Sequence, residues 1–247
     1  MGDGTELRRV VHTMGTVFSL TVRGADGPAP EALDEAEAWL RHVDAEFSTY
    51  REDSAISRIA RGELAPDDCA PEVREVLRLC ARAEADTDGW FSTGHSGGLD
   101  PSGLVKGWAV ERAAEGLLAA GATDVCVNGG GDVQLHGGPW RVGIAHPLRP
   151  GHVAAVVESR QGPLAVATSG PAERGCHIVD PHTGEAPAHG LASLTVVYEG
   201  LTDADTWATA AYAMGVHARA WLEAQPGVTA FAVTADGDTW SVGPQGR

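Results

Sequence analysis

Asp205 and Thr209 are the two side chains whose types and spacing point most directly to chemistry. They lie four residues apart in Thr202-Asp-Ala-Asp-Thr-Trp-Ala-Thr209, and residues i and i+4 share one face of a helix. A carboxylate and a hydroxyl on one face can both reach a hard cation such as Mg²⁺, which takes oxygen ligands. Alternatively, Asp203 or Asp205 caps the helix, because negative charge is favourable at a helix N-terminus. The two roles are compatible if Asp203 is the cap and Asp205 the ligand.

A second polar segment, Asp100-Pro-Ser-Gly103-Leu-Val-Lys106-Gly107, has features of an anion site. A glycine-containing turn that runs into a helix presents backbone N–H groups to an anion, and Lys106 adds positive charge. Asp100 can accept hydrogen bonds from a base or a ribose. The alternative is an ordinary loop with a surface lysine.

The overall charge makes such local devices necessary. The 247 residues carry a formal net charge of −16, which repels nucleic acid and anionic lipid, so neither is expected as a partner. The same charge repels phosphates. A dinucleotide would therefore need a divalent metal, a lysine or backbone N–H groups at its site.

Three further segments are candidates for ligand contact or catalysis. Val127-Asn-Gly-Gly-Gly-Asp132 follows a predicted strand and forms either a plain turn or a loop that approaches a ligand. It lacks the GxGxxG pattern of dinucleotide-binding folds. His177, in His177-Ile-Val-Asp180, is a possible proton carrier, although with ten histidines present a structural or surface role is the alternative. Met14 and Tyr50 suit contact with a flat ring or simple core packing.

Taken together, six segments in this order resemble the ApbE family, the FAD-dependent FMN transferases of flavoprotein maturation. They are Met14-Gly-Thr16, Phe47–Ser54, Leu99–Gly107, Val127–Asp132, Ala167–Gly170 with His177–Gly184, and Thr202–Thr209. The resemblance runs from about Val10 to Val242 and predicts one domain over residues 10–243.

The resemblance implies a role for each candidate residue. Mg²⁺ would be held by Asp205, Thr209 and the backbone carbonyl of Gly103. FAD would be contacted by Met14, Tyr50, Asp100, Lys106, Thr168 and Ile178. His177 would lie at the catalytic centre, where we infer that it acts as a general base.

The implied reaction is Mg²⁺-dependent transfer of the FMN moiety of FAD to a Thr or Ser hydroxyl of an acceptor flavoprotein, with release of AMP. Two alternatives stay open at this point. One is a Mg²⁺-dependent FAD pyrophosphatase that yields FMN and AMP, and the other is a flavin-binding protein without turnover.

The elements that must position these residues follow from hydrophobic periodicity. Helices are predicted over residues 31–47, 70–85, 104–120, 203–214 and 217–224, with a short one after Asp53-Ser54. Strands are predicted over 16–23, 124–127, 132–135, 140–145, 153–158, 164–168, 193–198, 228–234 and 239–242. Because helices and strands fall in blocks, we predict an α+β fold, ApbE-like and T-fold-like, with a mixed or antiparallel sheet and flanking helices.

The N-terminal sequence and the hydropathy pattern bear on location. Met1–Arg9 has neither an apolar run nor a small-residue cleavage site, so no signal peptide is predicted. No stretch has eighteen consecutive apolar residues, so no membrane span is predicted. The expectation is a cytoplasmic protein.

Overall fold

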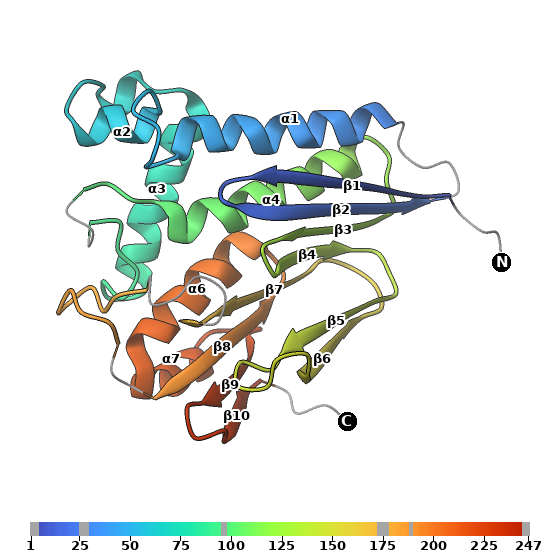
Figure 1. Cartoon of the computed structure of the whole chain (residues 1–247), viewed down its shortest axis with the longest axis vertical. Coiled ribbons are helices and arrows are strands. Elements are labelled where there is room, and N and C mark those ends of the chain that lie inside the picture. The colour runs from blue at the N-terminus through green and yellow to red at the C-terminus, as the bar shows by residue number, and fades with distance from the viewer. Residues whose placement is uncertain (1–4, 25–29, 95–97, 172–177, 188–189, 244–247) are drawn as a thin grey trace.

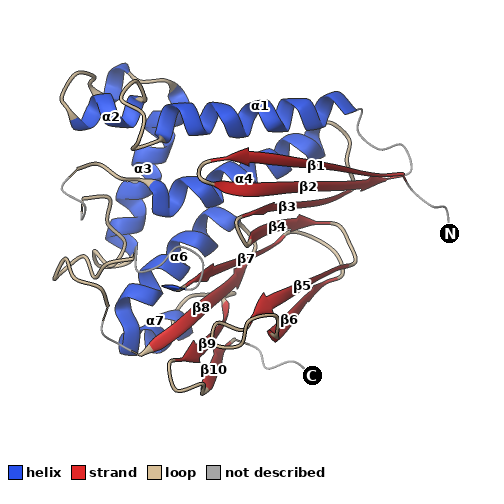
Figure 2. Ribbon diagram, in the orientation of Figure 1, coloured by secondary structure: helices blue, strands red, loops and turns tan. Residues whose placement is uncertain are grey.

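The fold is an antiparallel sheet with helices packed along it. The computed structural model describes residues 5–24, 30–94, 98–171, 178–187 and 190–243. Eight strands form one sheet in the order β1-β2-β3-β4-β7-β8-β9-β10, and β5 pairs with β6 apart from it (Figure 1). Helices and strands occupy separate parts of the molecule (Figure 2). This arrangement confirms the predicted α+β class.

The strands are β1 Thr5–Thr13, β2 Thr16–Gly24, β3 Asp124–Gly129, β4 Asp132–His136, β5 Trp140–Ala145, β6 Val153–Ser159, β7 Leu164–Ser169, β8 Leu191–Tyr198, β9 Thr229–Thr234 and β10 Thr239–Val242. The helices are α1 Pro30–Phe47, α2 Ala55–Ala60, α3 Pro71–Asp86, α4 Ser102–Ala119, α6 Leu201–Met214 and α7 Ala218–Glu223, with short 3₁₀ turns at Pro66–Asp68 and Gly215–His217.

The main core lies between the sheet and helices α1, α4 and α6. Alternate residues of β2, namely Phe18, Leu20 and Val22, are buried together with Val125 and Val127 of β3, as expected for a sheet with one face covered. Helix α4 packs on both α1 and α6. Packing against these neighbours fixes the crossing of α4 and α6, and the candidate site lies at this crossing.

The other face of β4 is covered by the β5–β6 hairpin. Val133 and Leu135 form a small second cluster with Trp140 of β5, and the Arg23 guanidinium stacks 4.2 Å from the Trp140 ring centroid. Because neighbouring residues of a strand point to opposite faces, Gln134 of β4 points the other way, toward α6.

Strand β1 was not predicted. It pairs with β2 along its whole length, from Thr5↔Gly24 to Thr13↔Thr16. Only Val11 is fully buried among its apolar side chains, so the alternation that reveals a half-buried strand is absent. Arg9 instead forms ion pairs with Asp34 and Glu37 of α1, and these tie the edge strand to the helix above it.

The remaining sequence expectations concern helix ends and membrane spans. The short helix predicted after Asp53-Ser54 is α2, and Ser54 caps it, with its hydroxyl accepting a hydrogen bond from the Ser57 N–H at 3.1 Å. Gly121 follows α4 with a φ of +98°. Among the described residues, no helix is both long enough and apolar enough to cross a membrane.

Candidate functional site

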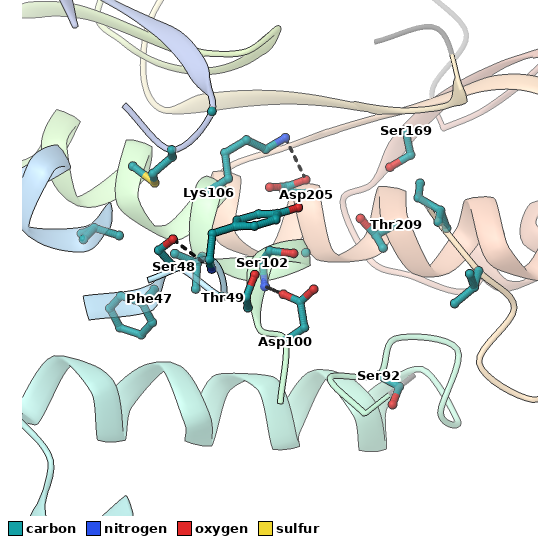
Figure 3. A pocket seen from close by; sticks show the side chains of 18 of the residues that line it. Phe47, Ser48, Thr49, Ser92, Asp100, Ser102, Lys106, Ser169, Asp205 and Thr209 are labelled. Carbon is teal, nitrogen blue, oxygen red and sulfur yellow. Dashed lines mark hydrogen bonds and ion pairs between the residues drawn. The ribbon is translucent and has the colours of Figure 1, made fainter. Parts of the chain in front are cut away.

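A cavity of about 560 Å³ lies where α4, α6, the β1–β2 turn and the loop after α1 meet (Figure 3). Nine of the ten residues singled out from the sequence line it. They are Met14, Tyr50, Asp100, Gly103, Lys106, Thr168, Ile178, Asp205 and Thr209. The tenth, His177, lies outside the described residues, and its neighbour Ile178 is buried in the cavity wall. Segments that are far apart in the sequence thus converge on one space.

The crossing of α4 and α6 forms the polar floor of this cavity. A Cβ added at Gly103 would lie 3.7 Å from Thr209 Cγ2, so the backbone of α4 passes close to that side chain. Asp205 is 5% exposed, and its Oδ2 accepts a hydrogen bond from the Gly107 N–H at 3.0 Å. A carboxylate, a hydroxyl and a backbone carbonyl are all oxygen donors, which is the donor set that Mg²⁺ prefers.

Few acidic groups are gathered at this floor. Within the part of the chain that the structure describes, there is no cluster of three or more His, Cys, Asp or Glu side chains suited to a metal. The predicted set contains one carboxylate only, so a Mg²⁺ ion held by it would take its remaining ligands from water or from substrate phosphates.

The start of α6 is held by side chains from elsewhere in the fold. Its N-cap residue is Gly200, which has no side chain to cap with. The Leu201 N–H donates to Gln134 Oε1 at 2.8 Å, and the Thr202 N–H donates to Glu111 Oε2 at 2.7 Å. These two acceptors satisfy free N–H groups of the first turn. They also fix the position of α6, and with it that of Asp205, relative to α4.

The predicted capping role of Asp203 is therefore wrong. Asp203 lies in the first turn of α6 and forms an ion pair with Arg82 of α3 at 2.8 Å. Burial raises the pKa of the Asp203 carboxyl above its ordinary value, and the Arg82 guanidinium partly offsets that rise. The Asp205 carboxylate accepts a hydrogen bond from the backbone of α4, at the Gly107 N–H.

Helices α4 and α6 approach each other closely at Gly107, and we predict that Gly107→Ala is destabilising. The new Cβ would lie 2.7 Å from the Leu201 carbonyl oxygen and 2.8 Å from Asp205 Cβ. Overpacking of this kind typically costs about 1–3 kcal/mol, measurable by urea unfolding.

The same helix offers a matched control in Gly116, where an added Cβ has nothing within 4 Å. Gly116→Ala should raise the free energy of unfolding by about 0.5–1 kcal/mol, since alanine is the better helix former. If the two variants have equal stabilities, the close approach at Gly107 does not matter.

The positive charge of the cavity comes from Lys106. Its ammonium forms an ion pair with Asp132 Oδ2 and lies 3.6 Å from Asp205 Oδ1 (Figure 3). The sequence left the Val127–Asp132 segment open, as a plain turn or a loop that approaches a ligand, and did not single out Asp132. No spacing rule links residues 106 and 132, so only the tertiary structure shows their contact.

The rim of the cavity carries the predicted ring contacts. Met14 and Gly15 form the two-residue turn between β1 and β2, with φ of +48° and +67°, the geometry of a type I′ hairpin. A methionine in the left-handed region costs about 1–3 kcal/mol, and such strain is typical of ligand sites. Tyr50 is 97% exposed at the edge of the cavity, while Trp90 packs edge-on against His182 with ring centroids 4.6 Å apart.

Asp100 stands at the entry to α4. Its Oδ1 accepts a hydrogen bond from the Ser102 N–H at 3.0 Å, so one oxygen already fixes the start of the helix. Ser102 and Gly103, the first two residues of α4, both line the cavity. The helix N-terminus is therefore directed at the space where an anion would sit.

The fold and the cavity together define an α+β protein with a site suited to an anionic, ring-bearing ligand. The ApbE family model matches residues 14–97 and 92–232. The chain therefore belongs to the ApbE family, which confirms the resemblance inferred from its six segments.

Individual relatives agree with this membership. The chain is 32% identical over 218 residues to an FAD:protein FMN transferase of Rhodobacter capsulatus, covering 83% of this chain and 38% of that protein. It is 25% identical over 299 residues to an FAD:protein FMN transferase of Salmonella typhimurium, covering 92% of this chain and 85% of that protein. It thus spans about two fifths of the first relative's length and most of the second's.

Among solved structures, the Pseudomonas stutzeri flavinyl transferase ApbE superposes with a TM-score of 0.85 at 27% identity. The match covers 98% of this chain and 96% of that one, so the whole described fold has its counterpart in that structure.

Proposed function

We propose that this chain is a flavin transferase that moves the FMN moiety of FAD to a Thr or Ser hydroxyl of an acceptor flavoprotein and releases AMP. Its family and the names of its relatives support this activity. The observation that carries the proposal is the convergence of nine residues, picked from separate sequence segments, on one cavity of about 560 Å³.

The residues present fit a magnesium ion. Asp205, Thr209 and the Gly103 carbonyl would hold it, because all three residues line the cavity and each carries an oxygen donor. When bound there, Mg²⁺ supplies neutralisation of the charge on the pyrophosphate of FAD. In a chain of net charge −16, that contribution is essential for binding a dianionic group.

The other residues bind and orient the substrate. Lys106 and the first N–H groups of α4 face the phosphates, while Met14 and Tyr50 contact a ring of FAD. The acceptor oxygen forms a bond to the phosphorus of the FMN half, and the bond from that phosphorus to the bridging oxygen breaks, so AMP leaves with that oxygen. His177 takes the proton from the acceptor hydroxyl, which makes its oxygen a better nucleophile.

The function is tested by counting products. Protein, FAD and Mg²⁺ are incubated first alone and then with an acceptor domain that carries a Thr in a flavinylation context. We expect one covalent FMN on the acceptor, seen by mass spectrometry, for each AMP released. With FAD alone we expect slow release of AMP and FMN, because a rim with Tyr50 97% exposed does not exclude water until an acceptor covers it.

Two outcomes would contradict the proposal. Rapid FMN and AMP release without any adduct, across several acceptors, would indicate a pyrophosphatase. Tight FAD binding with no product in either arm would indicate a flavin-binding protein without turnover.

A further inference from the structure

We propose that Asp132 is a positioning residue that shares the Lys106 ammonium with Asp205, so that this ammonium neutralises Asp205 only in part and the carboxylate stays available to the divalent cation. This inference rests on the proposed function, because it concerns the Mg²⁺ site assigned there. Asp132 does not line the cavity, and it acts through Lys106.

The Asp132 carboxylate is fixed at both of its oxygens. It is 2% exposed and stands at the first position of β4, after a turn in which the Gly131 N–H donates to Asn128 Oδ1 at 3.1 Å. Its Oδ1 accepts a hydrogen bond from the Thr168 N–H of β7 at 2.8 Å, and its Oδ2 pairs with Lys106. The carboxylate therefore cannot turn away from Lys106 without losing a backbone hydrogen bond.

Lys106 faces two carboxylates at once. It contacts Asp132, while Asp205 Oδ1 lies 3.6 Å from the ammonium. The side chains of Asp132 and Asp205 are 2% and 6% exposed, and that of Lys106 is 16% exposed. At such burial the interaction between charges is far stronger than in water, so the location of the ammonium decides how much negative charge Asp205 presents to a metal.

Removal of the Asp132 charge should therefore move Lys106 toward Asp205. The ammonium would then neutralise the carboxylate that Mg²⁺ needs, and the two cations would compete for it. A buried acidic residue beside a phosphate site is unfavourable at first sight in so acidic a protein. At Asp132 it would limit how far the Lys106 ammonium neutralises Asp205.

The test is Asp132→Asn, which keeps the size of the side chain and an oxygen for the Thr168 N–H. Mg²⁺ binding is measured by titration calorimetry without FAD. We expect roughly 10- to 100-fold weaker Mg²⁺ binding, the range for loss of a partner that orients a metal site. Asp236→Asn, in the exposed β9–β10 turn, makes the same change in net charge and should bind Mg²⁺ as the wild type does.

The decisive arm is rescue by a second substitution. Lys106→Met in the Asp132→Asn background removes the competing ammonium, so Mg²⁺ affinity should return to at least the wild-type value while FAD affinity, measured by flavin fluorescence, stays low. Mere loss of structural support at Asp132 predicts no rescue.

The outcomes separate this inference from the function on which it rests. A wild-type protein that binds no Mg²⁺ contradicts the proposed metal site itself. The role of Asp132 is overturned if Asp132→Asn binds Mg²⁺ as tightly as the wild type does. It is also overturned if adding Lys106→Met to Asp132→Asn does not tighten Mg²⁺ binding. If Asp132→Asn does not fold, Lys106→Met alone decides the matter: it should bind Mg²⁺ at least as tightly as the wild type, and weaker binding overturns the inference.

Discussion

A His177→Ala protein is expected to bind FAD as the wild type does and to lose most of its turnover. A positioned general base contributes roughly 10²–10⁴-fold to the rate of a reaction, and we propose His177 as that base. The residue after it, Ile178, is buried in the cavity wall. Fluorescence titration measures FAD affinity, and AMP release in the presence of acceptor measures turnover.

A control for this variant is His217→Ala, which changes an exposed histidine in the 3₁₀ turn after α6. It should keep both FAD affinity and turnover. A His177→Ala protein that turns over near the wild-type rate would assign His177 a structural role only. A loss of FAD affinity equal to the loss of rate would make it a binding residue.

The second large effect is expected at Asp205. Wild-type protein should bind FAD more tightly with Mg²⁺ than with EDTA, and Asp205→Asn should abolish that difference. The asparagine keeps the shape of the side chain and an oxygen for the Gly107 N–H, so the α4–α6 crossing is preserved. Loss of a direct ligand should weaken Mg²⁺ binding by more than the roughly 10- to 100-fold that an outer-shell partner contributes.

The matched control lies two residues earlier on the same helix. Asp203→Asn removes an equal charge, but its carboxylate pairs with Arg82 at the surface of α3, so the metal effect on FAD binding should persist. Equal FAD affinity with and without Mg²⁺ in the wild-type protein would exclude the metal assignment altogether.

The helices and most strands could be predicted because each contains its own signal. The three- and four-residue apolar repeat from Leu33 to Phe47 marks α1, and Trp140–Ala145 is delimited by glycine and proline. Strand β1 carries no such signal, because charged residues interrupt its apolar alternation, and one of them, Arg9, pairs with α1. A strand that is held by its partner strand and by ion pairs has no apolar alternation, so hydrophobic periodicity does not predict it.

Nine of the residues that line the cavity could be picked from the sequence one by one, but the residues that support them could not. Asp205, Thr209 and Lys106 stand in recognisable segments, and the cavity brings them together. The acceptors that hold the start of α6, Gln134 and Glu111, lie far away in the sequence, and nothing in their local context indicates this role. The local rule that favours an acidic cap pointed instead to Asp203, and tertiary contacts overrode it.

The pairing of β2 with β3 has a consequence for how the protein acquires its activity. Phe18 pairs with Gly129, and four helices intervene between these strands. Pairings this distant along the chain are slow to form, since a long loop must close before any contact stabilises it. Met14 and Tyr50 precede that closure in sequence, whereas Thr168 and Thr209 follow it, so no partly folded chain can present a complete cavity. During synthesis or refolding, the capacity to bind substrate should therefore appear late and in one step, together with the last strands of the sheet. A partly folded chain would not turn over FAD.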